Sequence, residues 1–189
     1  APDHFSRCSE INRQGPPLAS SLPEARPMEP KEFRARAEED RTIVLSIQNY
    51  ADFGGQHVPG AYNIDPAGNF STFAGWALPP DRDILLVAEN PAQVRDAVVM
   101  LRRVGLDRTV GYLEGGMHAW VMAGHPADHI CQLSPAETHA RLREGKAALV
   151  DVRSREEFEE QHVPGAINIM AMDLRTRHAE LDPDQPVIL

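Results

Sequence analysis

The chain has 189 residues, of which 42% are hydrophobic and 25% charged, and its formal net charge is −9. That charge argues against nucleic acid and anionic membrane surfaces as partners, because both are polyanions. The sequence contains neither a long apolar run that could span a bilayer nor the basic and apolar blocks of a signal peptide. We therefore expect a cytoplasmic protein without membrane contact.

The middle of the chain alternates between strand and helix patterns. An apolar run at Ile84–Ala88 predicts a buried strand, Pro91–Val104 an amphipathic helix, and Thr109–Leu113 a further strand. Such alternation predicts an α/β fold in which a parallel sheet is flanked by helices on both faces. The loop Glu89–Gln93 then lies at the carboxyl end of the sheet, where ligands bind near helix N-termini.

The C-terminal part repeats this kind of organisation. Ser134–Glu137 has the pattern of a capping box, and Gly145 is expected to end the helix that follows. A buried strand is predicted at Ala147–Val152 and a short helix at Ser154–Gln161.

The strongest feature of the sequence is an internal repeat. His57–Ile64 recurs as His162–Ile169 with seven of eight residues identical, at an offset of 105 residues. The offset then drops to 103, at which Ile84–Leu86 matches Val187–Leu189. The chain therefore contains two copies of one domain.

The repeated residues resemble a known family. Asp151-Val152-Arg153, Glu156, Phe158 and the motif at His162–Ile169 look like the first half of a rhodanese domain. Leu113–Trp120 resembles the motif that closes such a domain, in which Gly115-Gly116 permits an unusual backbone and Trp120 fills the core. The resemblance implies a rhodanese-like fold in two copies, the second incomplete.

The N-terminus carries a second resemblance. Phe5, Asn12, Gly15 and Pro16 are similar to the last helix of metallo-β-lactamase-fold enzymes of the persulfide dioxygenase type, some of which are fused to rhodanese domains. Residues 1–27 are therefore either the end of an upstream metallo-β-lactamase-fold domain or an unstructured leader. A proline-rich linker before the first rhodanese copy fits both interpretations.

The two copies divide the rest of the chain. Residues 28–128 are expected to form rhodanese-like domain 1, and residues 129–189 the N-terminal half of domain 2. In the family, a loop with the catalytic residue follows the strand that corresponds to Val187–Leu189. The repeat places the start of this loop, opposite Glu89, three residues after Leu189, so domain 2 is expected to be truncated before it. A half-domain buries too little surface to offset its conformational entropy. We therefore expect additional residues, or another chain in a homodimer, to supply the missing layer.

The first copy lacks the nucleophile that the resemblance implies. Family loops begin with cysteine, in a pattern close to Cys-x-x-Gly-x-Arg, and the thiolate takes sulfur from a donor. This copy reads Glu89-Asn90-Pro91-Ala92-Gln93-Val94, so glutamate, alanine and valine replace the cysteine, glycine and arginine. Glu89 is interpreted as a lone charge favoured by the helix dipole, with a general base as the alternative. Domain 1 is expected to be inert as a sulfurtransferase.

The second copy keeps the residues that support such a loop. In the family, Asp151, Arg153 and His162 would lie near the catalytic loop and brace it, whereas a surface ion pair is the simpler interpretation. In the first copy, Ser46 and Gln48 occupy the positions of that aspartate and arginine.

The remaining chemistry is sparse. Cys8 and Cys131 are interpreted as ordinary thiols, and no spacing of histidine or cysteine predicts a metal or another cofactor. The resemblance implies the rhodanese region of a sulfur-metabolism protein, with small sulfur donors and acceptors. The whole protein would be a sulfurtransferase or a persulfide-handling metallo-β-lactamase–rhodanese fusion. The alternative is a non-catalytic binding or regulatory module.

Overall fold

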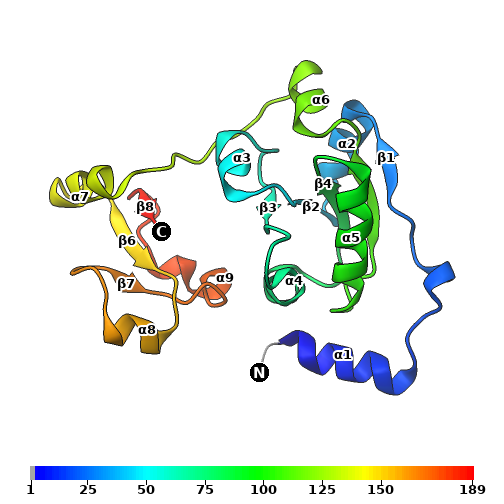
Figure 1. Cartoon of the computed structure of the whole chain (residues 1–189), viewed down its shortest axis with the longest axis horizontal. Helices are drawn as coiled ribbons and strands as arrows, with labels where there is room; N and C mark the ends of the chain where they lie inside the picture. Colours follow the sequence, from blue (N-terminus) through cyan, green and yellow to red (C-terminus); the bar gives the residue numbers. More distant parts are fainter. Residues whose placement is uncertain (1–2) are drawn as a thin grey trace. The chain divides into compact units, whose positions relative to one another are not determined.

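The computed structural model describes residues 3–189, with side chains from Phe5 onward, and the chain forms two compact units (Figure 1). Unit 1 is Ala1–Cys131 and unit 2 is Gln132–Leu189. Within the described residues, no helix combines the length and the apolar character needed to cross a membrane.

Unit 1 is a five-stranded sheet with helices. Its elements are α1 (Asp3–Gln14), η1 (Ala19–Ser21), β1 (Arg26–Met28), α2 (Pro30–Ala37), β2 (Thr42–Ser46), α3 (Tyr50–Gly55), β3 (Tyr62–Asn63), α4 (Phe70–Ala77), β4 (Asp83–Val87), α5 (Pro91–Arg102), β5 (Thr109–Leu113) and α6 (Gly116–Met122). The strands lie in the order β1-β5-β4-β2-β3, and all neighbouring pairs are parallel. The predicted parallel α/β fold is therefore confirmed.

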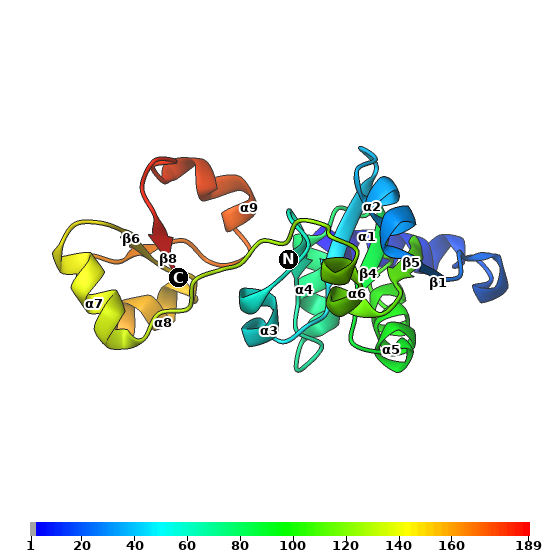
Figure 2. The same cartoon turned by 90° about the horizontal axis from the view of Figure 1, so that it is seen from above.

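The central strand β4 separates two apolar layers. All five of its residues are buried, and they alternate between the faces of the sheet. Ile84 and Leu86 pack with residues of α4 and α5, whereas Leu85 and Val87 pack with Phe33 of α2 and with α6. In Figure 2, α2 and α5 accordingly lie on opposite sides of the strands. The predicted cover on both faces is confirmed.

The N-terminal helix α1 packs against the rest of unit 1. The Arg7 guanidinium donates a hydrogen bond to the Val104 carbonyl (2.6 Å), and a Cβ at Gly105 would lie 2.9 Å from Ile11 Cδ1. The interpretation of residues 1–27 as an unstructured leader is therefore wrong for α1. The division of the chain into residues 1–27, 28–128 and 129–189 stays a prediction.

Unit 2 repeats the first part of unit 1. Its elements are α7 (Pro135–Arg143), β6 (Ala148–Asp151), α8 (Arg155–Glu160), β7 (Ile167–Asn168), α9 (Leu174–Arg177), η2 (His178–Glu180) and β8 (Val187–Ile188). The three strands are parallel in the order β7-β6-β8, which is the order of β3, β2 and β4 in unit 1.

Strand register follows the repeat residue by residue. Leu45 pairs with Tyr62 in unit 1, and Val150 pairs with Ile167 in unit 2, so both partners are shifted by 105 residues. The pairs of β2 with β4 reappear between β6 and β8, with the second partner shifted by 103 residues. Both offsets read from the sequence are therefore offsets between equivalent strand positions.

The two units differ in how well they cover equivalent side chains. Val58 is 4% exposed, whereas Val163 at the same place in unit 2 is 54% exposed. Leu86 is fully buried, whereas Leu189 is 74% exposed. Val150 and Ile169, equivalent to Leu45 and Ile64, are as deeply buried as their counterparts. Unit 2 therefore has the smaller core.

Candidate functional site

The predicted chemical loop lies between β4 and α5, at the carboxyl end of the sheet. Asn90 is the N-cap of α5, and its Oδ1 accepts from the backbone N–H groups of Ala92 and Gln93, both at 3.0 Å. The Glu89 N–H donates to Gln93 Oε1 (3.0 Å), and Pro91 has no N–H to offer. Amide groups that could hold an anion are thus bound to the loop's own side chains.

The Glu89 carboxylate also has a partner within the loop. Gln93 Nε2, in the first turn of α5, donates to Glu89 Oε2 at 3.3 Å, and Glu89 directly precedes the N-cap of that helix. Glu89 therefore has a neutral hydrogen-bond partner, and its interpretation as a charge favoured by the helix dipole stays a prediction. Val94, at the arginine position of the family pattern, is buried in the core rather than facing the loop.

Two glycines let the chain pass close beneath this loop. Gly115 and Gly116 both have positive φ, +72° and +59°. A Cβ at Gly116 would lie 2.9 Å from the carbonyl oxygen of Ala88, the residue just before the loop. Trp120 is buried, as predicted, with its ring edge-on to Phe33 and its Nε1–H donating to the Pro126 carbonyl (2.7 Å).

The repeated histidine has the same geometry in both units. His57 stacks on Phe53 with ring centroids 4.0 Å apart, and its Nδ1 lies 2.8 Å from the Phe53 carbonyl oxygen. His162 repeats this arrangement with Phe158, at 3.9 Å and 2.7 Å. Because a carbonyl oxygen only accepts, Nδ1 carries the proton in both rings. These contacts give the histidine a structural role in closing the turn.

The predicted supporting pair is formed in unit 2. Arg153 Nη2 lies 2.7 Å from Asp151 Oδ2, Nε lies 3.1 Å from Oδ1, and the Arg153 backbone N–H also donates to Oδ1 (3.0 Å). These Arg153 hydrogen bonds lower the pKa of Asp151, and the nearby His162 lowers it further. Arg153 Nη2 also donates to the Gln161 carbonyl (2.7 Å), so the pair ties both ends of α8 together.

Unit 1 replaces this ion pair with a neutral contact. The Ser46 hydroxyl donates to Gln48 Oε1 (2.9 Å), and both side chains are buried. An asparagine that the sequence reasoning did not single out completes each turn. Asn63 Nδ2 donates to the carbonyls of Ser46 and Gln48, and Asn168 does the same for Asp151 and Arg153. Its identity in both copies of the repeated motif was the available signal.

The other candidate groups lie apart from the loop. Cys8 is a half-buried free thiol on α1, and Cys131 is an exposed free thiol at the end of unit 1. Among residues 3–189, no group of three histidine, cysteine or acidic side chains is arranged to hold a metal ion.

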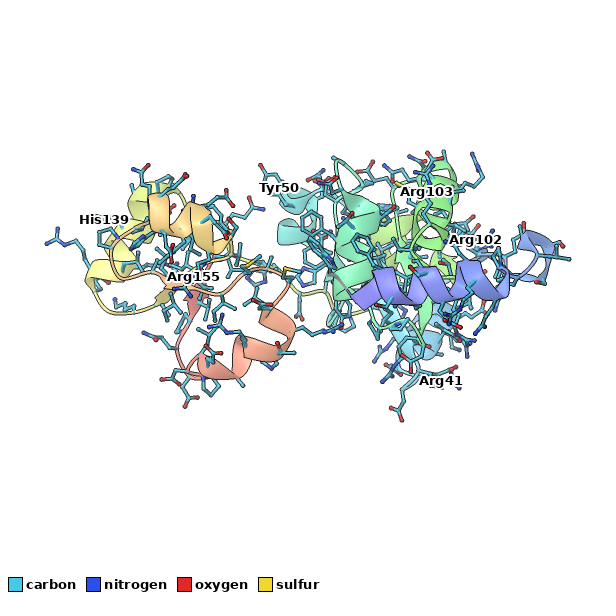
Figure 3. The ribbon with its side chains drawn as sticks, turned by 90° about the horizontal axis from the view of Figure 1, so that it is seen from below. Arg41, Tyr50, Arg102, Arg103, His139 and Arg155 are labelled. Atoms are coloured by element: carbon cyan, nitrogen blue, oxygen red, sulfur yellow. The ribbon has the colours of Figure 1, made fainter. Side chains whose placement is uncertain are left out.

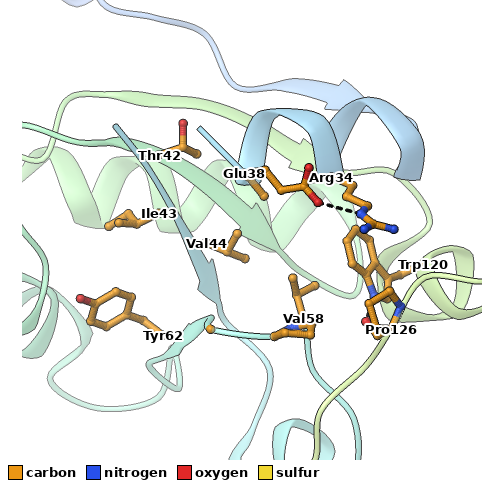
Figure 4. A pocket seen from close by; sticks show the side chains of 12 residues that line it. Arg34, Glu38, Thr42, Ile43, Val44, Val58, Tyr62, Trp120 and Pro126 are labelled. Atoms are coloured by element: carbon orange, nitrogen blue, oxygen red, sulfur yellow. Dashed lines mark hydrogen bonds and ion pairs between the residues drawn. The ribbon is translucent and has the colours of Figure 1, made fainter. Parts of the chain in front are cut away.

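A hollow of unit 1 lies away from the loop. It has a volume of about 360 Å³ and lies between α2 and the start of β2 (Figure 4). Its walls include the Trp120 ring, Val58 and the Arg34–Glu38 ion pair (2.9 Å). Because β2 and β4 are parallel, Thr42 at the start of β2 is at the opposite end of the sheet from Glu89.

These features define a class of α/β protein: two copies of a parallel-sheet unit whose His-Val-Pro-Gly turn and strand register are repeated. A family model for the rhodanese-like domain matches residues 29–123 and again residues 134–189. The chain therefore belongs to the rhodanese-like domain family.

Similar proteins include both a regulator and solved structures. The chain is 43% identical over 65 residues to the HTH-type transcriptional regulator Rv0324 of Mycobacterium tuberculosis (strain ATCC 25618 / H37Rv), and the match covers 34% of this chain and 27% of the regulator. The crystal structure of the Alr3790 protein from Anabaena sp. has 23% identity and a TM-score of 0.50, covering 71% of this chain and 100% of that chain. A metallo-beta-lactamase from Staphylococcus aureus subsp. aureus COL has 26% identity and a TM-score of 0.48, covering 60% of this chain and 30% of that one.

Proposed function

We propose that this chain is the rhodanese region of a sulfur-metabolism protein, in which unit 1 carries no sulfur and unit 2 belongs to the sulfur-transferring domain. One observation carries the proposal. Equivalent positions differ between the copies: unit 1 has a self-bonded Glu89 loop above a neutral Ser46–Gln48 contact, whereas unit 2 keeps the Asp151–Arg153 ion pair.

The chemistry of sulfur transfer explains why unit 1 is not expected to carry sulfur. In sulfur transfer, a thiolate attacks the outer sulfur of thiosulfate, forming a persulfide anion and releasing sulfite, and an acceptor such as cyanide then takes that sulfur and restores the thiolate. The Glu89 carboxylate cannot form this bond and would repel the dianionic donor. The loop amides that would stabilise the persulfide anion are bound to Asn90 and Gln93.

The test restores the cysteine nucleophile in two backgrounds, one with the loop amides still bound by Asn90 and Gln93 and one with these amides released. In a background with Cys8→Ser and Cys131→Ser, Glu89→Cys alone is expected to give almost no thiocyanate from thiosulfate and cyanide. Adding Asn90→Ala and Gln93→Ala releases three loop amides and is expected to raise the rate at least about tenfold. Rapid turnover by Glu89→Cys alone would show that the loop is already competent and would overturn the inert assignment.

The same proposal extends to the whole protein. The resemblance of Phe5, Asn12, Gly15 and Pro16 supports an upstream metallo-β-lactamase-fold domain of the persulfide dioxygenase type. The packing of α1 against unit 1 suits a segment that connects two folded domains. The test is the metal content and the persulfide-dependent oxygen consumption of the whole protein, and absence of both would remove this part of the proposal.

A regulatory binding role for unit 1 is the second candidate. It is favoured by the absence of cysteine from the loop Glu89–Gln93, and part of this chain shares 43% identity over 65 residues with a protein named as a transcriptional regulator. This role predicts that unit 1 binds a small sulfur compound without consuming it. Titration with thiosulfate and with inorganic polysulfide, followed by amide NMR shifts of unit 1, would show saturable changes if it does. Shifts that stay unchanged at millimolar concentrations of both would exclude this role for those compounds.

A further inference from the structure

Unit 2 contains a hollow whose lining does not include Asp151 or Arg153. It has a volume of about 430 Å³, between α8 and the start of α9. Its lining residues are Arg155, Phe158, Glu159, Asn168, Met170, Asp173 and Arg177. Because Asn168 ends β7, the hollow opens at the carboxyl edge of the sheet, where parallel α/β folds bind ligands.

The charges that line this hollow balance. Two guanidinium groups, from Arg155 and Arg177, face two carboxylates, from Glu159 and Asp173. Arg155 Nε lies 2.7 Å from Glu159 Oε1, which fixes one pair at one wall. Glu180, which lies outside the lining, pairs with Arg177, so the groups around the hollow sum to one negative charge and disfavour a dianion such as thiosulfate. The hollow suits a ligand that carries a positive group beside its negative one.

Arg177 is held in place by a residue outside the hollow. Its Nε and Nη2 donate to the two carboxylate oxygens of Glu180, at 2.7 and 2.8 Å. Such a two-point pair fixes the plane of the guanidinium. Asp173, by contrast, forms the N-cap residue of α9 without a side-chain capping bond. Its carboxylate is therefore not used by the helix that it begins.

The rest of the lining consists of two apolar side chains and one asparagine with a single hydrogen-bond acceptor left. Phe158 has one ring face against His162, and Met170 offers a thioether. Asn168 Nδ2 is committed to two backbone carbonyls, so only its oxygen is left to accept a hydrogen bond. This surface suits a short apolar or sulfur-containing side chain, because sulfur packs favourably on aromatic rings.

Unit 1 lacks this charge pattern at the equivalent place. At an offset of 105 residues, Tyr50 corresponds to Arg155 and Gly54 corresponds to Glu159. Figure 3 labels both Tyr50 on α3 and Arg155 on α8. The repeat therefore keeps the turn and the phenylalanine, and unit 2 alone adds the ion pair at the wall of the hollow.

We propose that the hollow of unit 2 binds a small α-amino-acid zwitterion with a sulfur-containing side chain, its ammonium group against Asp173 and its carboxylate against Arg177. The sulfur atom assigned to the ligand rests on the proposed function. It makes an amino-acid thiol or its persulfide, rather than thiosulfate, the compound that unit 2 receives.

The experiment uses stable probes that cannot transfer sulfur. The full chain is titrated with S-methyl-L-cysteine, and amide NMR shifts of α8, α9 and β7 are followed. Three comparisons separate the ligand features: 3-(methylthio)propanoate lacks the ammonium group, L-norvaline replaces sulfur with a methylene, and thiosulfate is the dianion. S-methyl-L-cysteine is expected to bind tighter than each, by about threefold over norvaline, the size of a sulfur–aromatic contact.

Matched variants locate the site. Asp173→Asn and Arg177→Gln are each expected to weaken S-methyl-L-cysteine binding by about threefold to fivefold, as for a partly exposed charge pair. Arg175→Gln is the control, because Arg175 is on the same short helix but does not line the hollow. It is expected to leave the affinity unchanged.

Several outcomes would overturn the inference. Thiosulfate binding as tightly as S-methyl-L-cysteine, or equal effects of Arg175→Gln and Arg177→Gln, would remove the zwitterion site. Equal affinity for norvaline would remove the sulfur specificity. Failure of the proposed function is read elsewhere, in the absence of thiocyanate formation from thiosulfate and cyanide by the whole protein, so the two results stay separate.

Discussion

Gly116 connects the closing motif of unit 1 to its degenerate loop. Its φ of +59° is costly for any residue with a side chain, and an added Cβ would meet the Ala88 carbonyl at 2.9 Å. We expect Gly116→Ala to lower the free energy of unfolding by about 2–3 kcal/mol, the left-handed backbone cost plus the displaced carbonyl. Urea unfolding followed by tryptophan fluorescence measures the change.

The matched control for this glycine is Gly124. It has a similar φ, +75°, but a Cβ there meets no atom within 4 Å. Gly124→Ala should therefore show only the backbone cost, about 1 kcal/mol. Equal losses for the two variants would mean that the approach to Ala88 contributes nothing to stability.

The Asp151–Arg153 pair makes a prediction about pH. Hydrogen bonds from Arg153 hold the pKa of Asp151 below its ordinary value of 3.8. A carboxylate whose pKa is lower in the folded state stabilises the fold above its unfolded pKa, and this contribution is lost as pH falls through the folded pKa. Carboxyl NMR titration should find the Asp151 midpoint below 3.8, and Arg153→Gln should raise it.

Arg155→Gln is the control for that titration. Arg155 pairs with Glu159 rather than with Asp151, so its loss should leave the Asp151 midpoint unchanged. An Asp151 midpoint at or above its ordinary value in the unmodified chain would show that the ion pair does not persist in solution.

At the residue scale, the sequence predicted identities better than hydrogen bonds. It located the Glu89 loop and the Asp151–Arg153 pair, but not the closure of that loop by Asn90 and Gln93. Closure depends on side-chain rotamers in a turn, which periodicity does not report. A local signal did exist, because asparagine directly before a proline at the first helical position is a typical N-cap.

At the scale of single elements, the capping box of α7 is the clearest prediction. The Ser134 hydroxyl accepts from the Glu137 N–H, and the Glu137 carboxylate accepts from Ser134, which lowers the pKa of Glu137. Helix α7 has no buried residue, so its cap carries much of its stability. Ser134→Ala should cost about 1 kcal/mol, seen as faster amide exchange in α7.

The equivalent cap on α8 provides the comparison. Ser154 and Glu157 form the same box, so Ser154→Ala should accelerate exchange in α8 and leave α7 unchanged. Acceleration of both helices by either variant would indicate that unit 2 opens as a whole rather than helix by helix.

Helix and strand positions were largely predictable because each rests on a local pattern. The helix predicted at Pro91–Val104 is observed at Pro91–Arg102, since the chain turns through Gly105 at positive φ. The order of strands in the sheet was not predicted. Strand β1 pairs with β5, which lies far away in the sequence. Neither the side-chain pattern of β1 nor its length of three residues indicates β5 as the partner.

At the scale of the whole molecule, the two units should differ in stability. Unit 2 has 58 residues, and its sheet consists of three short strands. Several of its large apolar side chains are exposed, including Val163, Ile167 and Val187. Small domains bury a smaller share of their apolar surface, which is the main favourable term in folding. Unit 1, with apolar layers on both faces of its sheet, should persist at higher temperature.

Both tryptophans of the chain, Trp76 and Trp120, lie in unit 1, so two probes can separate the units. Tryptophan fluorescence reports unit 1 alone, whereas far-UV circular dichroism reports helices of both. On heating, ellipticity should begin to fall before the fluorescence changes, because α7 and α8 melt first. Coincident transitions by the two probes would contradict this, since they are the mark of a single cooperative unit. Replacing the exposed Val163 with threonine should leave the fluorescence transition unchanged.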